Sequence, residues 1–220
     1  MYKITDARAA TATCANNPRK SSSALGTAEW AALAGSVDSS FAPFVVTIDA
    51  QCDRIIALAG VTSGDVVCDL GFGDASFLLK MASATGCRCI GCEVNGDLVA
   101  EATDRVARAG EVGSRVALTQ ALISTFVEST AFLETATVIY VALVPSTMAE
   151  LEPVLRAALQ RPGVRVVSQR FEAAGLTASR SIDGGDASPD GSYFSDGGPA
   201  YLYEHAAVAA AVPLAVPAMA

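Results

Sequence analysis

VVCDLGFGDASFLLKMA, residues 66–82, is the stretch that decides the fold of this chain. Residues 66–70 are apolar apart from one aspartate, which predicts a buried strand. The glycines at 71 and 73 predict a tight turn, and an apolar helix should begin near Ala75 with Asp74 as its N-cap. Glycine lets the backbone approach a ligand, and the unpaired N–H groups of a helix N-terminus can face that ligand. The stretch therefore predicts a strand–turn–helix cradle that fits a nucleotide.

Two acidic residues indicate which nucleotide this cradle would bind. Asp69 precedes the turn, and Glu93 ends the next predicted strand, where a carboxylate can bind ribose hydroxyls. The dinucleotide fingerprint G-x-G-x-x-G is not met, because Ser76 stands in place of its third glycine. A carboxylate beside the turn suits a cationic ligand better than a pyrophosphate, and S-adenosylmethionine carries a sulfonium and an ammonium but no phosphate. We therefore predict S-adenosylmethionine as the cofactor; a glycine turn that only joins strand to helix is the alternative.

Strands and helices alternate along the rest of the chain. Helices are expected at 48–59, 98–109 and from Thr147, which has capping-box spacing to Glu150, to 160. Further strands are expected at 88–93, 115–119, 137–143 and 164–168, with a final hairpin from 176–182 and 201–204. This order predicts an α/β fold with a doubly wound, Rossmann-like seven-stranded sheet and an antiparallel C-terminal hairpin. The ligand site should lie at the carboxyl ends of the central strands.

The ends of the chain differ from its middle. We expect one domain at residues 41–205, an N-terminal extension at 1–40 that is partly irregular, and an apolar C-terminal tail at 206–220. No run of 18 apolar residues occurs, so no spanning helix is expected. The early basic residues, with many Ser, Thr and Ala, resemble a mitochondrial transit peptide, while the cysteine usage fits any reducing compartment. We expect a cytoplasmic protein, with a mitochondrial location as the alternative.

The charge and the cysteine content of the chain limit the classes of partner and ligand that it is expected to bind. The net charge is −8, from 15 basic and 23 acidic residues, which argues against a long nucleic-acid track and suits a lysine-bearing protein. The run CRCIGC at 87–92 invites a metal interpretation, but no second cysteine pair follows and the only histidine is His205. We expect no metal site there, and a strand that places Cys89 and Cys92 on opposite faces. The sequence sets no oligomeric state.

Several motifs resemble one enzyme class. The pattern D-L-G-x-G at 69–73, followed by Glu93, resembles motifs I and II of the class I S-adenosylmethionine-dependent methyltransferases. The segments PFVVTI at 43–48, TVIYVALVP at 137–145 and GVRVVS at 163–168 are similar to a small group of protein-lysine methyltransferases. That group includes archaeal enzymes and mitochondrial enzymes that act on the ATP synthase c-subunit. The resemblance implies sheet order 3-2-1-4-5-7-6 and methylation of lysine side chains of a protein.

The resemblance also implies roles for single residues. Tyr140 is an aromatic neighbour of the methyl-transfer mouth, although a purely core role for it is the stronger interpretation. The mouth itself would be shaped by Leu143 and Pro145. The residues expected to bind the cofactor are Thr47, Asp69, Gly71, Gly73, Glu93, Val94, Gln120 and Ala121.

Four departures from that group keep other functions open. Ala142 replaces a tyrosine, Gln169 replaces a histidine, the prolines of the group's PFVPTP signature are missing, and residues 120–122 lack the usual acid. One alternative is therefore a methyltransferase that acts on a small molecule or on RNA. The other is a diverged, inactive cofactor-binding interaction module. A nicotinamide-dependent oxidoreductase is disfavoured by the missing third glycine.

Overall fold

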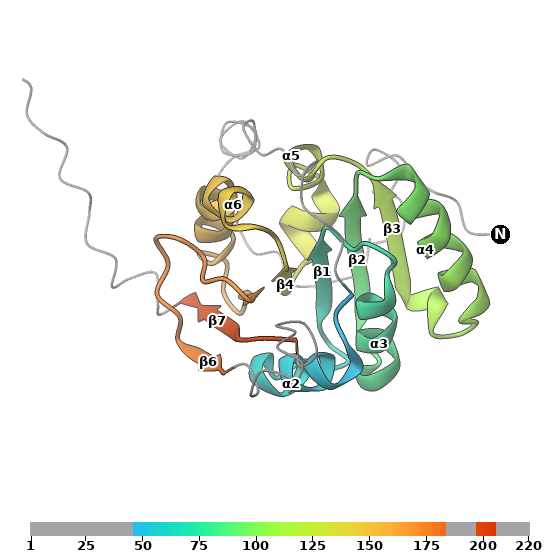
Figure 1. The fold of residues 1–220 in the computed structure, drawn as a ribbon, viewed down its shortest axis with the longest axis horizontal. Helices are drawn as coiled ribbons and strands as arrows, with labels where there is room; N and C mark the ends of the chain where they lie inside the picture. The colour runs from blue at the N-terminus through green and yellow to red at the C-terminus, as the bar shows by residue number, and fades with distance from the viewer. Residues whose placement is uncertain (1–45, 184–196, 206–220) are drawn as a thin grey trace, which may run out of the picture.

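A seven-stranded sheet forms the centre of the computed structural model, which describes residues 46–183 and 197–205. The whole predicted extension at 1–40, residues 41–45 and 184–196 of the predicted domain, and the tail at 206–220 lie outside the described residues. The strands are β1 (Val66–Leu70), β2 (Arg88–Glu93), β3 (Val116–Gln120), β4 (Val138–Val141), β5 (Arg165–Gln169), β6 (Arg180–Ile182) and β7 (Ala200–Glu204). Their order is β3-β2-β1-β4-β5-β7-β6 (Figure 1). Strands β1 to β5 are parallel and β7 is antiparallel to β5 and β6, which confirms the predicted fold class.

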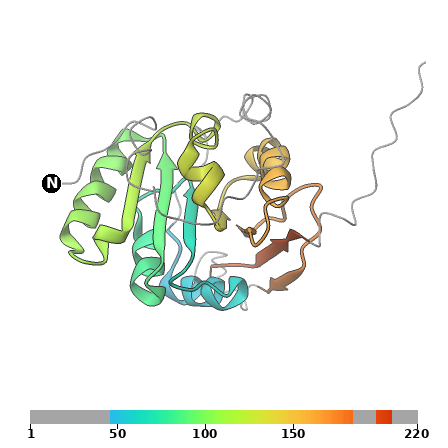
Figure 2. The same cartoon turned by 180° about the vertical axis from the view of Figure 1, so that it is seen from behind.

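Helices cover both faces of this sheet. The helical elements are α2 (Asp49–Ala59), α3 (Ser76–Thr85), α4 (Gly96–Arg108), the 3-10 turn η2 (Gly113–Arg115), α5 (Ile123–Phe126), the π-helical turn η3 (Ala131–Thr135) and α6 (Pro145–Ala158). Helices α2, α3 and α4 pack on one face, and α5, η3 and α6 pack on the other (Figures 1 and 2). All five residues of β1 are buried, as expected for a central parallel strand covered on both sides.

The two core clusters follow the alternation of side chains along the strands. On the α3 face, Phe77 and Met81 pack with Val67, and on the α6 face Leu151 packs with Ile139. Cys89 and Cys92 join opposite clusters, as predicted. Within residues 46–183 and 197–205, no helix has both the length and the apolar character needed to cross a bilayer.

Helix ends account for most differences from the predicted elements. Asp74 is not the N-cap of α3: Ala75 takes that position with a left-handed φ of 60°, and the carboxylate of Asp74 accepts the N–H of Ser76 at 3.0 Å. Helix α6 begins at Pro145 rather than at the predicted cap Thr147, because proline has a helical φ and needs no N–H partner in the first turn. Helix α4 begins at Gly96, two residues before the predicted start at 98, and its first buried side chain is Val99.

Candidate functional site

The predicted site residues gather at one edge of the sheet. Strand β1 lies between β2 and β4, and the crossovers that follow β1 and β4 leave on opposite faces, so the carboxyl ends of these two strands form the switch point at which sheets of this kind bind ligands. The structure places all of them at these carboxyl ends or just before α2: Thr47, Asp69, Gly71, Gly73, Glu93, Val94, Gln120, Ala121, Tyr140, Leu143 and Pro145.

Glu93 connects the glycine turn after β1 to the loop after β2. Its Oε2 accepts the N–H of Gly73 at 3.2 Å, and its Oε1 accepts the N–H groups of Val94 and Asn95 at 2.9 Å each. Gly73 has a φ of 56°, which is in the left-handed region that favours glycine. A carboxylate oriented by three backbone donors holds both loops in one geometry and still has a lone pair on Oε2 that can accept a ligand hydroxyl.

Asp69 is the least satisfied carboxylate of the site. It is 3% exposed, and within the described parts of the chain no hydrogen-bond donor or basic side chain pairs with its carboxylate. Burial raises the pKa of Asp69 well above its usual range, and the negative charge of Glu93 raises it further. The carboxylates of Asp69 and Glu93 therefore favour a positively charged ligand beside the glycine turn.

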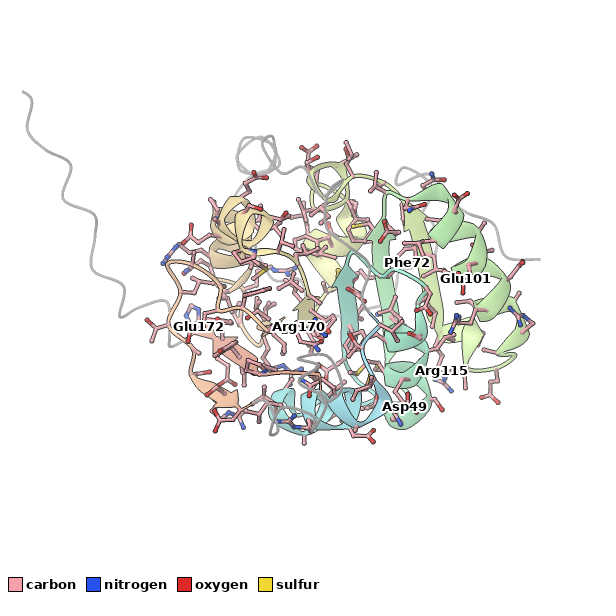
Figure 3. The ribbon with its side chains drawn as sticks, in the orientation of Figure 1. Asp49, Phe72, Glu101, Arg115, Arg170 and Glu172 are labelled. Carbon is pink, nitrogen blue, oxygen red and sulfur yellow. The ribbon has the colours of Figure 1, made fainter. Side chains whose placement is uncertain are left out.

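The turn also contacts the segment that follows β4. A Cβ atom at Gly71 would lie 3.3 Å from Cδ2 of Leu143, so the missing side chain lets Leu143 close over the turn. Pro145 is exposed as the first residue of α6, and Ala142 is also exposed. Phe72 of the turn, labelled in Figure 3, belongs to the core cluster on the α3 and α4 face of the sheet. The segment that follows β4 therefore places apolar side chains beside the turn.

Tyr140 is a buried wall of this region and not part of its open mouth. It is 2% exposed, and its ring stacks on Phe77 with centroids 3.9 Å apart. Its hydroxyl lies 2.9 Å from Oγ1 of Thr47 and donates to Oε1 of Gln169. Burial, followed by the charge of Asp69, raises the pKa of Tyr140 well above its usual range. These contacts fit the core role more closely than the role at the mouth.

Backbone hydrogen bonds hold the ends of β2 and β3 together beside the site. The N–H of Ala121 donates to the carbonyl oxygen of Glu93 at 3.1 Å, so this N–H is already used. Gln120 is exposed and pairs with Glu93 across the β2–β3 register. Its side-chain amide lies over Gly96, where a Cβ atom would come within 3.2 Å of Nε2.

Sequence reasoning missed an ion pair that supports the turn. Oδ2 of Asp74 lies 2.8 Å from Nη2 of Arg105, and the same nitrogen pairs with Glu101, which lies one turn earlier on α4. The Asp74 side chain is 8% exposed, so this bridge fixes the turn against α4. No local signal could have found the pair, because 31 positions separate its members in sequence.

The chain is similar to several known methyltransferases. The model of the ANTKMT methyltransferase domain family matches residues 69–180. A protein-lysine N-methyltransferase of Saccharolobus islandicus is 31% identical over 141 residues, which are 64% of this chain and 83% of the relative. A solved structure of an RNA methyltransferase of Salinibacter ruber in complex with S-adenosyl-L-homocysteine is 31% identical in sequence and superposes with a TM-score of 0.60. The match covers 72% of this chain and 92% of that one. A precorrin-6y C5,15-methyltransferase of Geobacter metallireducens shares the fold alone, at 13% identity and a TM-score of 0.54 over 77% of this chain and 94% of that one.

Proposed function

The chain belongs to the ANTKMT methyltransferase domain family, and from this premise we propose that it methylates the ε-amino group of lysine in a protein. It is an S-adenosylmethionine-dependent methyltransferase. The lysine acceptor is supported by the name of the Saccharolobus relative and by the net charge of −8, which attracts a basic partner.

One observation carries the assignment of the site: the carboxylate of Asp69 lies buried beside a glycine turn and has no partner among residues 46–183 and 197–205. S-adenosylmethionine supplies a methyl group activated by a sulfonium. Its positive charge would offset the negative charge of the Asp69 and Glu93 carboxylates. Gly71 and Gly73 leave room for its amino-acid part, and Glu93 is oriented to accept its ribose hydroxyls. The residues present therefore fit this cofactor.

We assign the remaining roles by position. Leu143 and Pro145 shape the mouth where donor and acceptor meet, and Tyr140 supports that mouth from within the core. The residues that bind the cofactor are Thr47, Asp69, Gly71, Gly73, Glu93, Val94, Gln120 and Ala121. We place the methyltransferase domain at residues 41–205 and the protein in the cytoplasm, with a mitochondrial location as the alternative.

The residues of the mouth need only orient the acceptor. In-line displacement requires an uncharged amine held close to the methyl group, and the lysine can lose its proton to solvent before it binds. A strong base is not required. His205, the only histidine of the sequence, follows the antiparallel strand β7, which ends at the opposite edge of the sheet, and its Nδ1 lies 2.8 Å from the carbonyl oxygen of Leu159. Leu143 and Pro145 exclude water around the amine.

RNA methylation is the second candidate, because the Salinibacter structure is named an RNA methyltransferase and is as similar in sequence as the lysine enzyme. Binding of RNA relies on clustered basic side chains that neutralise phosphates. Here acidic residues outnumber basic ones by 23 to 15, and many described arginines are paired with carboxylates, as Arg105, Arg156 and Arg165 are. Charge therefore favours the protein acceptor.

A labelling experiment tests the proposal. The purified chain is incubated with S-adenosylmethionine labelled in the methyl group and a cell lysate, which is then split into protein, RNA and small-molecule fractions. We expect label in protein that survives ribonuclease and is lost on protease treatment, with methyl-lysine after hydrolysis. A Glu93→Ala variant serves as the cofactor-binding control. Label confined to the RNA fraction, or to small molecules, would refute lysine methylation.

A further inference from the structure

We propose that Gln169 is a positioning residue that points the hydroxyl proton of Thr47 into the core, so that Thr47 presents only lone pairs to the ammonium group of the cofactor. The inference rests on the proposed function, since it concerns the same cofactor. Gln169 lies at the end of β5, and no sequence motif suggested a role for it beyond the departure from histidine.

The first step is the orientation of the Gln169 amide. Its Nε2 donates to the carbonyl oxygen of Gly197 at 2.7 Å, and the residue is 2% exposed. A carbonyl only accepts, so the nitrogen of the amide must face Gly197 and Oε1 must face the other way. The side-chain flip that is often ambiguous in glutamine is therefore fixed by its partner.

The second step is that the acceptor itself is held firmly. Three successive carbonyl oxygens accept bonds: Gly197 from Gln169, Gly198 from Nε2 of Gln51 at 3.1 Å, and Pro199 from the backbone N–H of Arg170 at 2.7 Å. Arg170 is labelled in Figure 3. Gln51 is fully buried, and a Cβ atom at Gly197 would lie 2.7 Å from its side chain. The segment 197–199 thus has little freedom to release Gln169.

In the third step, the orientation of the Gln169 amide fixes which way the hydroxyl groups of Tyr140 and Thr47 donate their protons. Oε1 of Gln169 can only accept, so the hydroxyl of Tyr140 donates to it. The oxygen of Tyr140 then accepts from Thr47, whose Oγ1 is 2.9 Å away. Oγ1 of Thr47 is also 3.3 Å from Oε1 of Gln169, so either partner draws the proton of Thr47 inward. Stacking on Phe77 keeps Tyr140 in place.

The chemical consequence is a site for a positively charged donor. Thr47 is half-buried, and its outward lone pairs remain after its proton is committed to the core. Asp69 adds a carboxylate on the same face of the sheet, because it is the direct strand partner of Tyr140 in the parallel β1–β4 pair. The committed hydroxyl of Thr47 and the carboxylate of Asp69 therefore suit an ammonium group better than an anion.

Equilibrium binding of two ligands to the full chain tests this inference. S-adenosylhomocysteine contains the amino-acid ammonium, whereas 5′-methylthioadenosine lacks the amino-acid part. We expect Thr47→Val and Gln169→Leu each to raise the Kd for S-adenosylhomocysteine about tenfold, as for one hydrogen bond to a charged group, and to leave the Kd for 5′-methylthioadenosine within about twofold. The double variant should lose no more than either single variant, because both changes act on one contact. Thr103→Val, whose hydroxyl bonds only the carbonyl of Val99 on α4, is the matched control.

The outcomes separate this inference from the proposed function. If the unaltered protein binds neither ligand, the assignment of the cofactor fails and this inference fails with it. If the unaltered protein binds S-adenosylhomocysteine but Thr47→Val does not weaken it, only the role of Thr47 and Gln169 is overturned. Equal losses for both ligands, or additive losses in the double variant, also overturn it, because they indicate a general disturbance of the fold. Should Gln169→Leu not fold, the Thr47→Val result decides alone.

Discussion

Replacement of Asp69 by asparagine should have opposite effects on stability and on cofactor binding. In the protein without ligand, the carboxylate is 3% exposed and faces the charge of Glu93 with no basic partner in the described parts of the chain. The Asp69→Asn change keeps the shape of the side chain and removes its charge. The variant should therefore unfold at higher denaturant concentration than the unaltered protein, while its affinity for the cationic cofactor should fall.

The size of each effect follows from burial. Removal of one charge-assisted contact in a buried setting costs about 1.5–3 kcal/mol of binding free energy, which is a rise of roughly 10- to 150-fold in Kd. The gain in unfolding free energy at neutral pH should be smaller, about 1 kcal/mol, because the asparagine amide is also left without partners. The folded protein raises the pKa of Asp69, so the folded state holds this proton more tightly than the unfolded state, whose aspartate titrates near about 3.9.

The pH dependence gives a second measurement with a definite sign. Above about pH 4 the unfolded chain releases the proton first, so the contribution of Asp69 to stability falls as pH rises toward the raised folded pKa. The variant lacks this loss, and the stability gap between the two proteins should widen from about pH 4 upward. Urea titrations of both proteins at a series of pH values from about 4 upward measure the widening gap, and calorimetry of S-adenosylmethionine binding measures the loss of affinity. A variant that is less stable at neutral pH, or one that binds the cofactor as well as before, would refute the reasoning.

Three further changes test the loops around the site. Glu93→Ala should weaken cofactor binding by about 1–3 kcal/mol, measured by calorimetry, because it removes the carboxylate that orders both loops; unchanged affinity would exclude Glu93 from the site. Arg105→Ala breaks the bridge to Asp74 and should lower the unfolding free energy by about 0.5–1 kcal/mol in a urea titration. Arg108→Ala on the same helix, where the arginine bonds only a backbone carbonyl, should change stability little, and equal losses in the two variants would contradict a role for the bridge. Gly91→Ala places a Cβ atom 2.8 Å from a carbonyl oxygen of β1 and should cost about 1–3 kcal/mol, seen as a lower melting temperature; a neutral result would mean that the strands can shift apart.

Local patterns were sufficient for the elements that carry the fold. Strand β1 and strand β2 have the predicted bounds, and the sheet order agrees with the order implied by the resemblance. The α2 and α4 helices were found from their apolar spacing, within two residues at each end. The caps were less predictable, because Ala75 adopts a left-handed conformation that no residue type in this turn signals.

The sequence by itself determined a doubly wound sheet with an acidic, glycine-rich turn at its switch point, because strand alternation, helix periodicity and turn residues are short-range properties of a chain. Only the tertiary structure decided how those parts orient one another. The Asp74–Arg105 bridge and the hydroxyl chain from Thr47 through Tyr140 to Gln169 join residues up to 122 positions apart. A hydrogen bond or an ion pair depends on the distance between two groups in space, and that distance exists only after the layers have packed.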